Sequence, residues 1–418
     1  MAFNPFKETG KDKSKLFDCW NKLYPMSYDK NEVDPYTKTR IILMNGAEFE
    51  ANWFMHQFSR HCPDNDLRRA IAFVRRNEQQ QQKRIACLKP IDETILETTI
   101  SYEQLAVDLT ARLAQMEKDP YVKSAMDLAL LEDFDHLYRY ADLLEFDSGI
   151  HAEKLVGRYT EIMPGRPTIA EHRHPNDDIR YFVDFKKADP ITKLNINIIT
   201  AAEQQTMNYY MNVAGFYQND LGRQLYQEIG MIEEQHVSSY GSLLDTRCTW
   251  LEELLMHEYT ECYLYYSCMQ SETDAKVRKI WQAHLEDELT HLQMASELLE
   301  KYEGRHWQEV FTCGGDFPEL LVLGPNVEYV RNILENTVRN SAKKEEIVHL
   351  DSLPEDYEYF CYQKSVNSPI NSVPSHRVIE QYIESNGMDY RFEVEPHPVE
   401  ELQNREKDNT EIGRIQGK

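Results

Sequence analysis

A long internal repeat restricts the fold of this chain more than any other feature of its sequence. Residues 34–38 read Asp-Pro-Tyr-Thr-Lys and residues 189–193 read Asp-Pro-Ile-Thr-Lys, while Leu-Leu-Glu occurs at both 143–145 and 298–300. Both pairs are 155 residues apart, and the two copies align between these anchors without a gap. Each copy spans about 110 residues, which suits one small helical module. The repeat therefore predicts a duplicated architecture.

Apolar residues within each copy recur with the spacing of one helix face. In the second copy one such stripe contains Leu225 and Ile229, and turn residues interrupt the pattern at 219–222, 245–249 and 271–274. Spacings of three and four residues indicate amphipathic helices, and the polar breaks indicate the turns between them. We therefore predict an all-α fold with four helices in each copy.

Four glutamates of the second copy lie on faces that should point inward: Glu203, Glu233, Glu258 and Glu288. An unpaired carboxylate is very costly to bury, and converging carboxylates also repel one another. A pair of bound divalent cations would remove both costs. Glu203 and Glu233 are 30 residues apart, as are Glu258 and Glu288. Each interval therefore fits a helical hairpin that returns to the same depth.

Two of these glutamates begin a Glu-x-x-His motif, Glu233 with His236 and Glu288 with His291. The spacing places both side chains of a motif on one helix face. One glutamate from each of two helices, with Glu-x-x-His from the other two, is the ligand pattern of dinuclear carboxylate sites in four-helix bundles. A single motif is more often a solvated helix face, but two motifs with paired glutamates and equal spacing favour metal binding.

The first copy repeats this pattern in a weaker form. Its motifs read Glu-x-x-Gln and Asp-x-x-His, and a neutral amide is a poorer iron ligand than an imidazole. We therefore predict a weakened ligand set in this copy. Its candidate ligands, each 155 positions before a counterpart, are Glu48, Glu78, Gln81, Glu103, Asp133 and His136.

At these residues the chain resembles the ferritin-like di-iron superfamily, and most closely the rubrerythrins. Rubrerythrins carry a further glutamate three residues after the third-helix ligand, which corresponds to Glu261. They also carry tyrosines that match Tyr210 and either Tyr265 or Tyr266. The resemblance implies that Glu261 is both a ligand and a catalytic group, and that Tyr210 and Tyr265 act beside the metals.

The resemblance covers residues 34–145 and 189–300 and implies two ferritin-like four-helix bundles. It also implies a non-haem oxidoreductase that reduces peroxide or dioxygen at two iron ions per site, without haem or nucleotide. Manganese suits the same oxygen and nitrogen ligands. Rubrerythrins typically add a cysteine-rich electron-transfer domain, but none of the eight cysteines here forms a Cys-x-x-Cys pair. We therefore expect an external electron-donor protein.

Other functions remain open at this point. The absent electron-transfer domain and Gln81 favour a non-catalytic protein that binds or stores metal, or uses it as a structural support. An oxygenase acting on an organic substrate is a third hypothesis. Tyr240 follows His236 at a spacing that resembles ribonucleotide reductase small subunits, but we interpret it as core packing. For His284, one turn before Glu288, support of a ligand and plain helix packing are equally favoured.

Chain length restricts how the helices can pair. The ligand pattern requires the second and third helices to run parallel. Only 25 residues separate Glu78 from Glu103, and Glu233 from Glu258, and a helix of that length covers about 37 Å, with no room for a crossover. We therefore expect helices one and two of each copy to pair with helices three and four of the other copy.

This exchange would occur within one chain or between the two chains of a homodimer. It predicts two mixed sites. One would hold Glu48, Glu78, Gln81, Glu258, Glu261, Glu288 and His291, and the other Glu203, Glu233, His236, Glu103, Asp133 and His136.

Composition excludes several classes of partner. The chain has 46 basic and 71 acidic residues and a net charge of −25, which argues against nucleic-acid binding. No stretch is apolar enough to cross a membrane, and the N-terminal residues lack the apolar segment of a secretory signal. The cysteine pattern forms no disulfide framework, so we expect a cytoplasmic protein.

The repeats leave three further segments: an N-terminal extension, a linker and a C-terminal extension. In the N-terminal extension a short helix is predicted around residues 15–23. In the C-terminal extension helices are predicted over 326–339 and 375–385, with Ser375 as N-cap, and the charged end 400–418 is expected to be disordered. His172 and His174, in a proline-bounded loop, are interpreted as a solvated pair. The expected organisation is 1–33, extension; 34–150, first repeat; 151–188, linker; 189–303, second repeat; and 304–418, C-terminal extension.

Overall fold

The computed structural model describes residues 2–387, 391, 394–403, 405, 408 and 412, and this part of the chain confirms the all-α class. The one exception among these residues is a short antiparallel hairpin of β1 (Asn340–Lys343) and β2 (Glu346–His349). No helix in the described part is both long and apolar enough to cross a membrane. Eight long helices occupy the two copies: α1 (Pro35–His61), α2 (Asn65–Ala86), α3 (Ile95–Met116), α4 (Pro120–Ser148), α7 (Pro190–Val213), α8 (Asp220–Gly241), α9 (Trp250–Ser271) and α10 (Ala275–Glu303).

Helix ends are encoded in the same way in both copies. Thr94 and Thr249 begin α3 and α9 with capping boxes, in which the threonine and a glutamate three residues later each bond the other's backbone N–H. Gly149 and Gly304 end α4 and α10 with φ values of 67° and 65°. Only glycine adopts this left-handed conformation without strain, so these positions terminate the helices.

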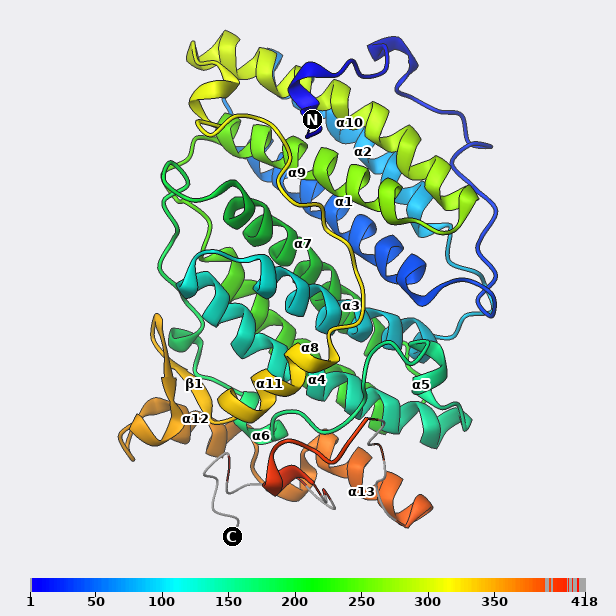
Figure 1. Cartoon of the computed structure of the whole chain (residues 1–418), viewed down its shortest axis with the longest axis vertical. Helices are drawn as coiled ribbons and strands as arrows, with labels where there is room; N and C mark the ends of the chain where they lie inside the picture. The colour runs from blue at the N-terminus through cyan, green and yellow to red at the C-terminus, as the bar shows by residue number, and fades with distance from the viewer. Residues whose placement is uncertain are drawn as a thin grey trace. The chain divides into compact units, whose positions relative to one another are not determined.

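The long helices form two compact units, and each unit takes segments from both copies. Unit 1 comprises residues 1–93, 182–205 and 244–322, and unit 2 comprises residues 94–181, 206–243 and 323–418. In unit 1, α1 packs against α2 and α9, and α10 packs against α9 and α2. In Figure 1 the blue α1 and α2 accordingly lie beside the yellow-green α9 and α10. Unit 1 therefore joins the first helix pair of one copy to the second pair of the other, within one chain.

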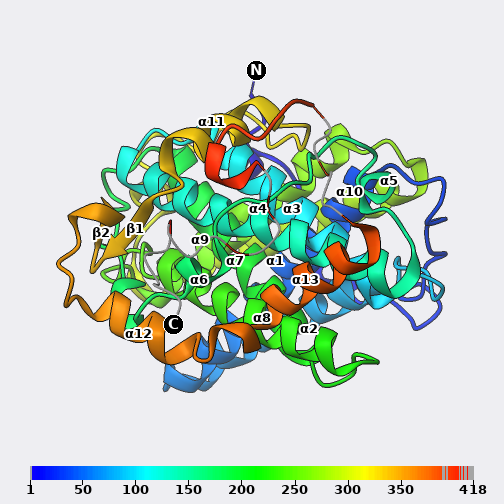
Figure 2. The same ribbon diagram turned by 90° about the horizontal axis from the view of Figure 1, so that it is seen from below.

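Unit 2 contains α3, α4, α8 and the end of α7, and α4 packs against both α3 and α8. Its shorter helices come from the linker and the C-terminal extension. Of these, α13 packs against α4 and α8, as Figure 2 shows for α8, and α11 packs against α4. The shorter helices are α5 (Ala152–Leu155), α6 (Thr168–Glu171), α11 (Val327–Thr337), α12 (Glu358–Val366) and α13 (Pro374–Asn386).

The predicted helix around residues 15–23 is wrong. Only a single 3₁₀ turn, Lys13–Lys15, forms there. Side chains of α2 bond the backbone of this segment instead: Asn77 donates to the Leu16 carbonyl, Gln80 bonds Asp18, and Arg84 donates to the Lys22 carbonyl. These bonds satisfy backbone groups that a helix would otherwise pair internally.

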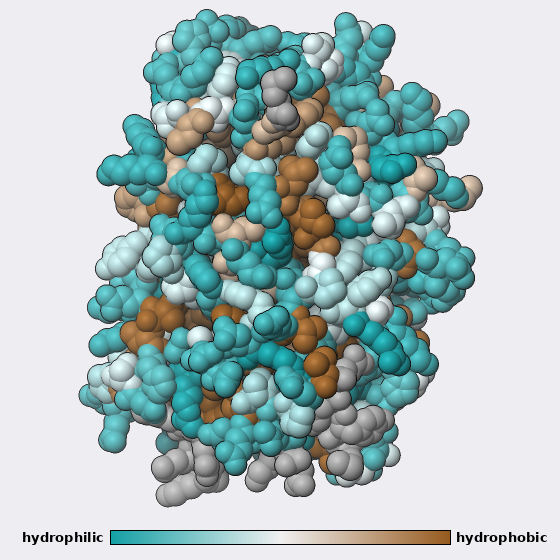
Figure 3. All heavy atoms as spheres, in the orientation of Figure 1, coloured by the Kyte–Doolittle hydropathy of each residue, from teal (hydrophilic) through white to brown (hydrophobic). Residues whose placement is uncertain are grey.

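In the C-terminal extension α11 and α13 lie within one or two residues of the predicted helices, but Ser375 is not the N-cap of α13. Val373 occupies that position, and both the N–H and the hydroxyl of Ser375 donate to Glu228 of α8. Gly387 follows the last residue of α13, as predicted. The expectation of disorder at 400–418 falls largely outside the described residues. Hydrophilic side chains cover most of the face seen in Figure 3.

Candidate metal centres

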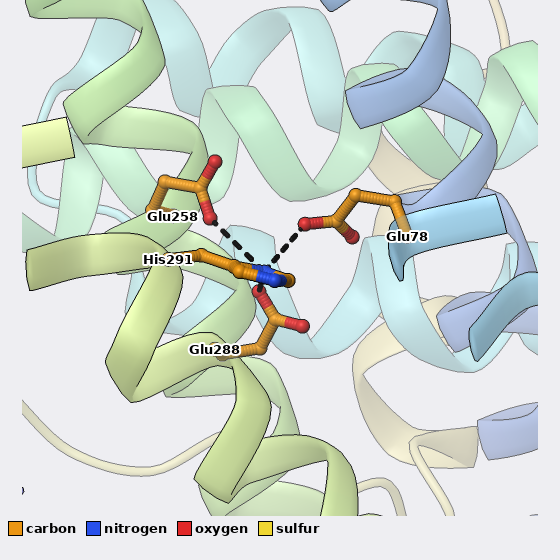
Figure 4. Close-up of side chains that lie close together, drawn as sticks. All are labelled: Glu78, Glu258, Glu288 and His291. Carbon is orange, nitrogen blue, oxygen red and sulfur yellow. Dashed lines mark hydrogen bonds and ion pairs between the residues drawn. The ribbon is translucent and has the colours of Figure 1, made fainter. Parts of the chain in front are cut away.

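Three helices of unit 1 bring four predicted ligands together. Glu78 comes from α2, Glu258 from α9, and Glu288 and His291 from α10, and each offers one ligand atom within 4.8 Å of the others. Figure 4 shows these side chains converging on a common point. All four are buried, with exposed fractions of 0–1%. This arrangement can hold a metal ion.

A second group adjoins the first through a shared residue. Glu48 of α1, Glu261 of α9 and Glu78 also offer ligand atoms within 4.8 Å of one another. Gln81, the seventh residue predicted for this site, is buried and donates a hydrogen bond from its amide to Glu288. Glu78 can therefore bridge two ions, and the Gln81 amide N–H holds the Glu288 carboxylate in place.

Burial leaves some of these oxygens unsatisfied. Among the described residues, both carboxylate oxygens of Glu261 and Oε2 of Glu258 lack a hydrogen-bond partner. Burial and the charge of Glu78 raise the pKa of Glu258 and Glu261 well above the ordinary value, and that of Glu288 to about 7. Burial alone would lower the pKa of His291, but Glu288 and Glu78 reverse this and raise it. Buried carboxylates this close together must be neutralised by protons or by bound cations. Carboxylate oxygens and imidazole nitrogens are ligands that suit iron or manganese.

The His291 ring is oriented by a residue that the sequence did not reveal. Its Nδ1 lies 2.7 Å from Glu78 Oε1 and 3.1 Å from Glu288 Oε2, while its Nε2 lies 2.9 Å from Asn77 Oδ1. The Asn77 amide nitrogen donates to the Leu16 carbonyl at 2.9 Å, so the amide oxygen faces the ring. His291 therefore donates its Nε2 proton to Asn77 and can present the Nδ1 lone pair to a metal.

Replacing Asn77 is expected to weaken metal binding without removing a ligand. In Asn77→Leu the ring loses its acceptor, and loss of such a partner typically costs about 10–100-fold in metal affinity. Competition with a chelator of known affinity measures the change. Asn77→Asp, which keeps the acceptor, should retain more affinity than Asn77→Leu; equal affinity in wild type and Asn77→Leu would show that Asn77 does not orient the ligand.

A hydrogen-bonded chain leads from Glu48 toward the surface of unit 1. The Tyr265 hydroxyl donates to Glu48, and His284 Nδ1 lies 3.0 Å from that hydroxyl. Arg84 Nη1 lies 3.1 Å from His284 Nε2. Because Arg84 is only a donor, His284 accepts at Nε2 and donates from Nδ1 to Tyr265. His284 therefore bonds Tyr265, which in turn bonds Glu48. Of the two roles considered for His284, this contact favours support of a ligand over plain helix packing.

The structure also selects between the two adjacent tyrosines of α9. Tyr265 is fully buried and bonds Glu48, whereas Tyr266 stacks on Phe3 with ring centroids 4.2 Å apart. Tyr265 is therefore the tyrosine beside the cluster. Tyr240 is fully buried, in agreement with core packing, and its ring centroid lies 6.5 Å from that of His236.

Unit 2 contains the second cluster. Glu103 of α3, His136 of α4 and Glu233 of α8 offer ligand atoms within 4.8 Å of one another. His236 Nδ1 lies 3.3 Å from Asp133 Oδ1 and 3.4 Å from Glu233 Oε2. Glu103, Asp133, His136, Glu233 and His236, all predicted for this site, thus lie close together.

The remaining predicted residues are on α7. Glu203 is buried, with an exposed fraction of 1%, and lies in the stretch of α7 that belongs to unit 1, just before the helix enters unit 2. Tyr210 lies further along α7, in unit 2, and its hydroxyl donates to Glu103. Tyr210 therefore bonds a glutamate of the second cluster in the same way as Tyr265 bonds Glu48 of the first.

The histidines of unit 2 also present Nδ1 inward and Nε2 outward. His236 Nε2 lies 2.8 Å from Glu132 Oε2, and His136 Nε2 lies 3.6 Å from Glu171 Oε2. Burial alone would raise the pKa of Glu132, but Arg173 and His236 lower it to about 2. The outer carboxylate is therefore ionised and can accept the Nε2 proton of His236.

Glu171 and Arg173 were missed because the linker supplies them, whereas Glu132 lies on α4. Glu171 accepts from Arg139, and Arg173 donates to Glu132. The prediction of a solvated histidine pair was wrong for His172, which is buried 3.8 Å from Glu228. Within the His-x-His motif, the central Arg173 is the residue that bonds Glu132 behind the cluster. Nothing in the helical spacing indicated that the linker packs behind the cluster.

A scan against protein-family models and searches of curated proteins and solved structures found no match to this chain.

Proposed function

We propose that the chain is a ferritin-like protein with two bundles built by exchange of helix pairs, and that its unit 1 cluster is a non-haem di-iron centre that reduces peroxide or dioxygen. The observation that supports this proposal most directly is the unit 1 cluster itself. Carboxylates from α1, α2, α9 and α10 converge there with His291, and Glu261 contributes two oxygens without hydrogen-bond partners. The rubrerythrin-like position of Glu261 supports this activity.

The unit 1 residues fit two metal ions. Glu258, Glu288 and His291 would hold one, Glu48 and Glu261 the other, and Glu78 would bridge them. A reduced iron pair supplies two electrons and Lewis acidity to a bound oxidant; manganese is the second candidate metal. The buried walls exclude water and keep the effective dielectric constant low, which strengthens these electrostatic interactions.

Two side chains are positioned to act beside the metals. The Tyr265 hydroxyl donates a hydrogen bond to Glu48, and thereby holds that carboxylate in one orientation. Glu261 has no such restraint among the described residues, because neither of its oxygens has a hydrogen-bond partner. A carboxylate of this kind can move toward or away from an ion as the charge of the centre changes. Tyr210 holds Glu103 in the second cluster in the same manner as Tyr265.

Replacing Glu261 is expected to separate metal binding from turnover. Glu261→Gln keeps the shape of the side chain but removes its charge, and the other carboxylates and His291 remain. We expect bound metal to be retained and peroxide turnover to fall by at least about tenfold, which corresponds to 1.4 kcal/mol of transition-state stabilisation. Metal content and peroxide consumption with an artificial reductant measure the two effects. Unchanged turnover would remove Glu261 from the proposed mechanism.

One observation favours the alternative of a metal-binding, storage or structural protein. His291, with its raised pKa, pairs with Glu78 and Glu288, and the Gln81 amide bonds Glu288, so the cluster partly neutralises itself. Repeated additions of peroxide with excess reductant separate the two functions. Sustained consumption supports an oxidoreductase, whereas one equivalent per centre followed by no reaction supports storage or a structural role.

The proposed activity needs an electron source outside the described helices, and we propose an external donor protein. All eight cysteines are free thiols, including the exposed Cys19, Cys313 and Cys361. Exposed free thiols favour a reducing compartment, and we propose the cytoplasm.

A further inference from the structure

A basic pocket lies on unit 1 at the outer end of the hydrogen-bonded chain from Glu48. Its volume is about 540 Å³, within the usual range for small-molecule sites. Five cationic side chains and one carboxylate line it, in a chain whose net charge is −25. Its charged lining residues are Lys11, Lys15, Lys22, Arg84, Lys279 and Asp18.

The cations of this basic pocket exceed the carboxylates that pair with them. Asp18 pairs with Lys22 at 3.0 Å and with Arg84, and Asp287 pairs with Lys11. Across the described part of the chain, no carboxylate forms an ion pair with Lys15 or Lys279, the other two cations of the lining. The charge of Lys15 also lowers the pKa of the nearby Asp12. Five positive charges therefore face three negative ones, which leaves an excess that a small anion would neutralise.

Arg84 connects the basic pocket to the interior. Its side chain is only 10% exposed, and its guanidinium donates to the Lys22 carbonyl at 3.1 Å, to Asp18, and to His284 Nε2 at 3.1 Å. His284 in turn bonds Tyr265, whose hydroxyl donates to Glu48. One side chain therefore lines the pocket and also begins the chain that ends at a candidate metal ligand.

We propose that the basic pocket binds a small anion bearing a phosphate or carboxylate group, and that Arg84 and His284 transmit its presence to the hydrogen bond between Tyr265 and Glu48. Phosphate and carboxylate match the fork of donors that a guanidinium presents. A bound anion competes with Asp18 for Arg84, and this competition changes the donor that faces His284. The overall charge of −25 repels an acidic protein surface more than a small ion.

Calorimetric titration of the full-length protein with inorganic phosphate and with succinate, at constant ionic strength, tests the binding step. The comparison is between wild type, Lys15→Glu/Lys279→Glu, and a matched charge control, Lys154→Glu/Lys301→Glu, whose lysines are exposed outside the pocket. We expect wild type and control to bind one anion per pocket with similar affinity, and the pocket variant to bind at least about tenfold more weakly. Equal affinity in all three proteins would overturn the assignment. The anion that binds more tightly shows whether the pocket prefers a phosphate or a carboxylate group.

Cobalt(II) bands in the visible spectrum test the transmission step, which rests on the proposed metal centre. In cobalt-loaded wild type we expect the preferred anion to shift these bands, and in the pocket variant and in His284→Phe to leave them unchanged. The pocket variant alters exposed lysines only, so it serves if His284→Phe fails to fold. A band shift that persists in the pocket variant would mean direct anion binding to the metal and would overturn the transmission. Failure to load cobalt would count against the metal centre while leaving the calorimetric result standing.

Discussion

Protein purified anaerobically from iron-supplemented cells is expected to contain about two metal ions in each loaded centre. Glu258→Gln/Glu288→Gln should remove those of unit 1, because it removes the charges of two carboxylates that converge there with Glu78 and His291. Glu103→Gln/Glu233→Gln should remove those of unit 2. Elemental analysis by ICP-MS on wild type and both variants then assigns the metals to their centres and identifies iron or manganese.

Exposed glutamates of α10 provide the control for this experiment. Glu297→Gln/Glu300→Gln removes two negative charges from the same helix without touching the cluster, and should leave metal content unchanged. Circular dichroism checks that each variant keeps its helices. A wild-type protein without transition metal would contradict the metal hypothesis and leave protonation and ion pairing as the reason for the buried carboxylates.

Metal-free protein is expected to lose stability as pH rises, and metal-loaded protein to resist this loss. The pKa of a glutamate is about 4.3 in unfolded chains, whereas that of Glu288 in the folded, metal-free protein is about 7. Between these values the folded state binds more protons than the unfolded state, so the free energy of unfolding falls with rising pH. Glu258 and Glu261, whose pKa values are also raised, act in the same direction.

His291 adds to this slope. Its pKa is raised in the folded state, so its contribution to stability is fully present below the unfolded value of about 6.5 and is lost as pH rises through the folded value. Each unit of pKa shift corresponds to about 1.4 kcal/mol. Through Glu288 alone, the free energy of unfolding therefore falls by on the order of 3 kcal/mol as pH rises from about 4.3 to about 7. Bound metal displaces these protons and removes their contribution.

Scanning calorimetry at several pH values between about 5 and 8, with and without prior chelation, measures this difference. The transition temperature of chelated protein should fall across the range, and the separation from metal-loaded protein should grow. Glu288→Gln should reduce the slope of the chelated protein, whereas Glu297→Gln, at an exposed position of the same helix, should not. A slope of the opposite sign would mean that the cluster carboxylates are already ionised in the folded, metal-free state.

The predictable parts of the candidate centres were those that depend on position along a helix. The spacing of Glu288 and His291 places both on one face of α10, and the structure brings both to one cluster with Glu78 and Glu258. Burial of these side chains followed from the apolar stripes around them. The grouping of helices into units followed from chain length, since 25 residues leave no room for a crossover.

Groups that act on the ligands from outside the helical pattern were not predictable. Asn77 adjoins Glu78 in sequence, but its role depends on the Leu16 carbonyl, which turns its amide oxygen toward His291. Glu171 and Arg173 come from a linker without periodicity, so no pattern placed them behind His136 and His236.

By itself the sequence determined the all-α class and the identity of the buried acids, because these depend on local periodicity and the repeat. The tertiary structure alone decided which nitrogen of each histidine faces the cluster, that Gln81 donates to Glu288, and that Arg84 and His284 lead from a basic pocket to Tyr265. Those features arise where side chains distant in sequence meet. Their hydrogen-bond geometry is set by packing rather than by spacing along the chain.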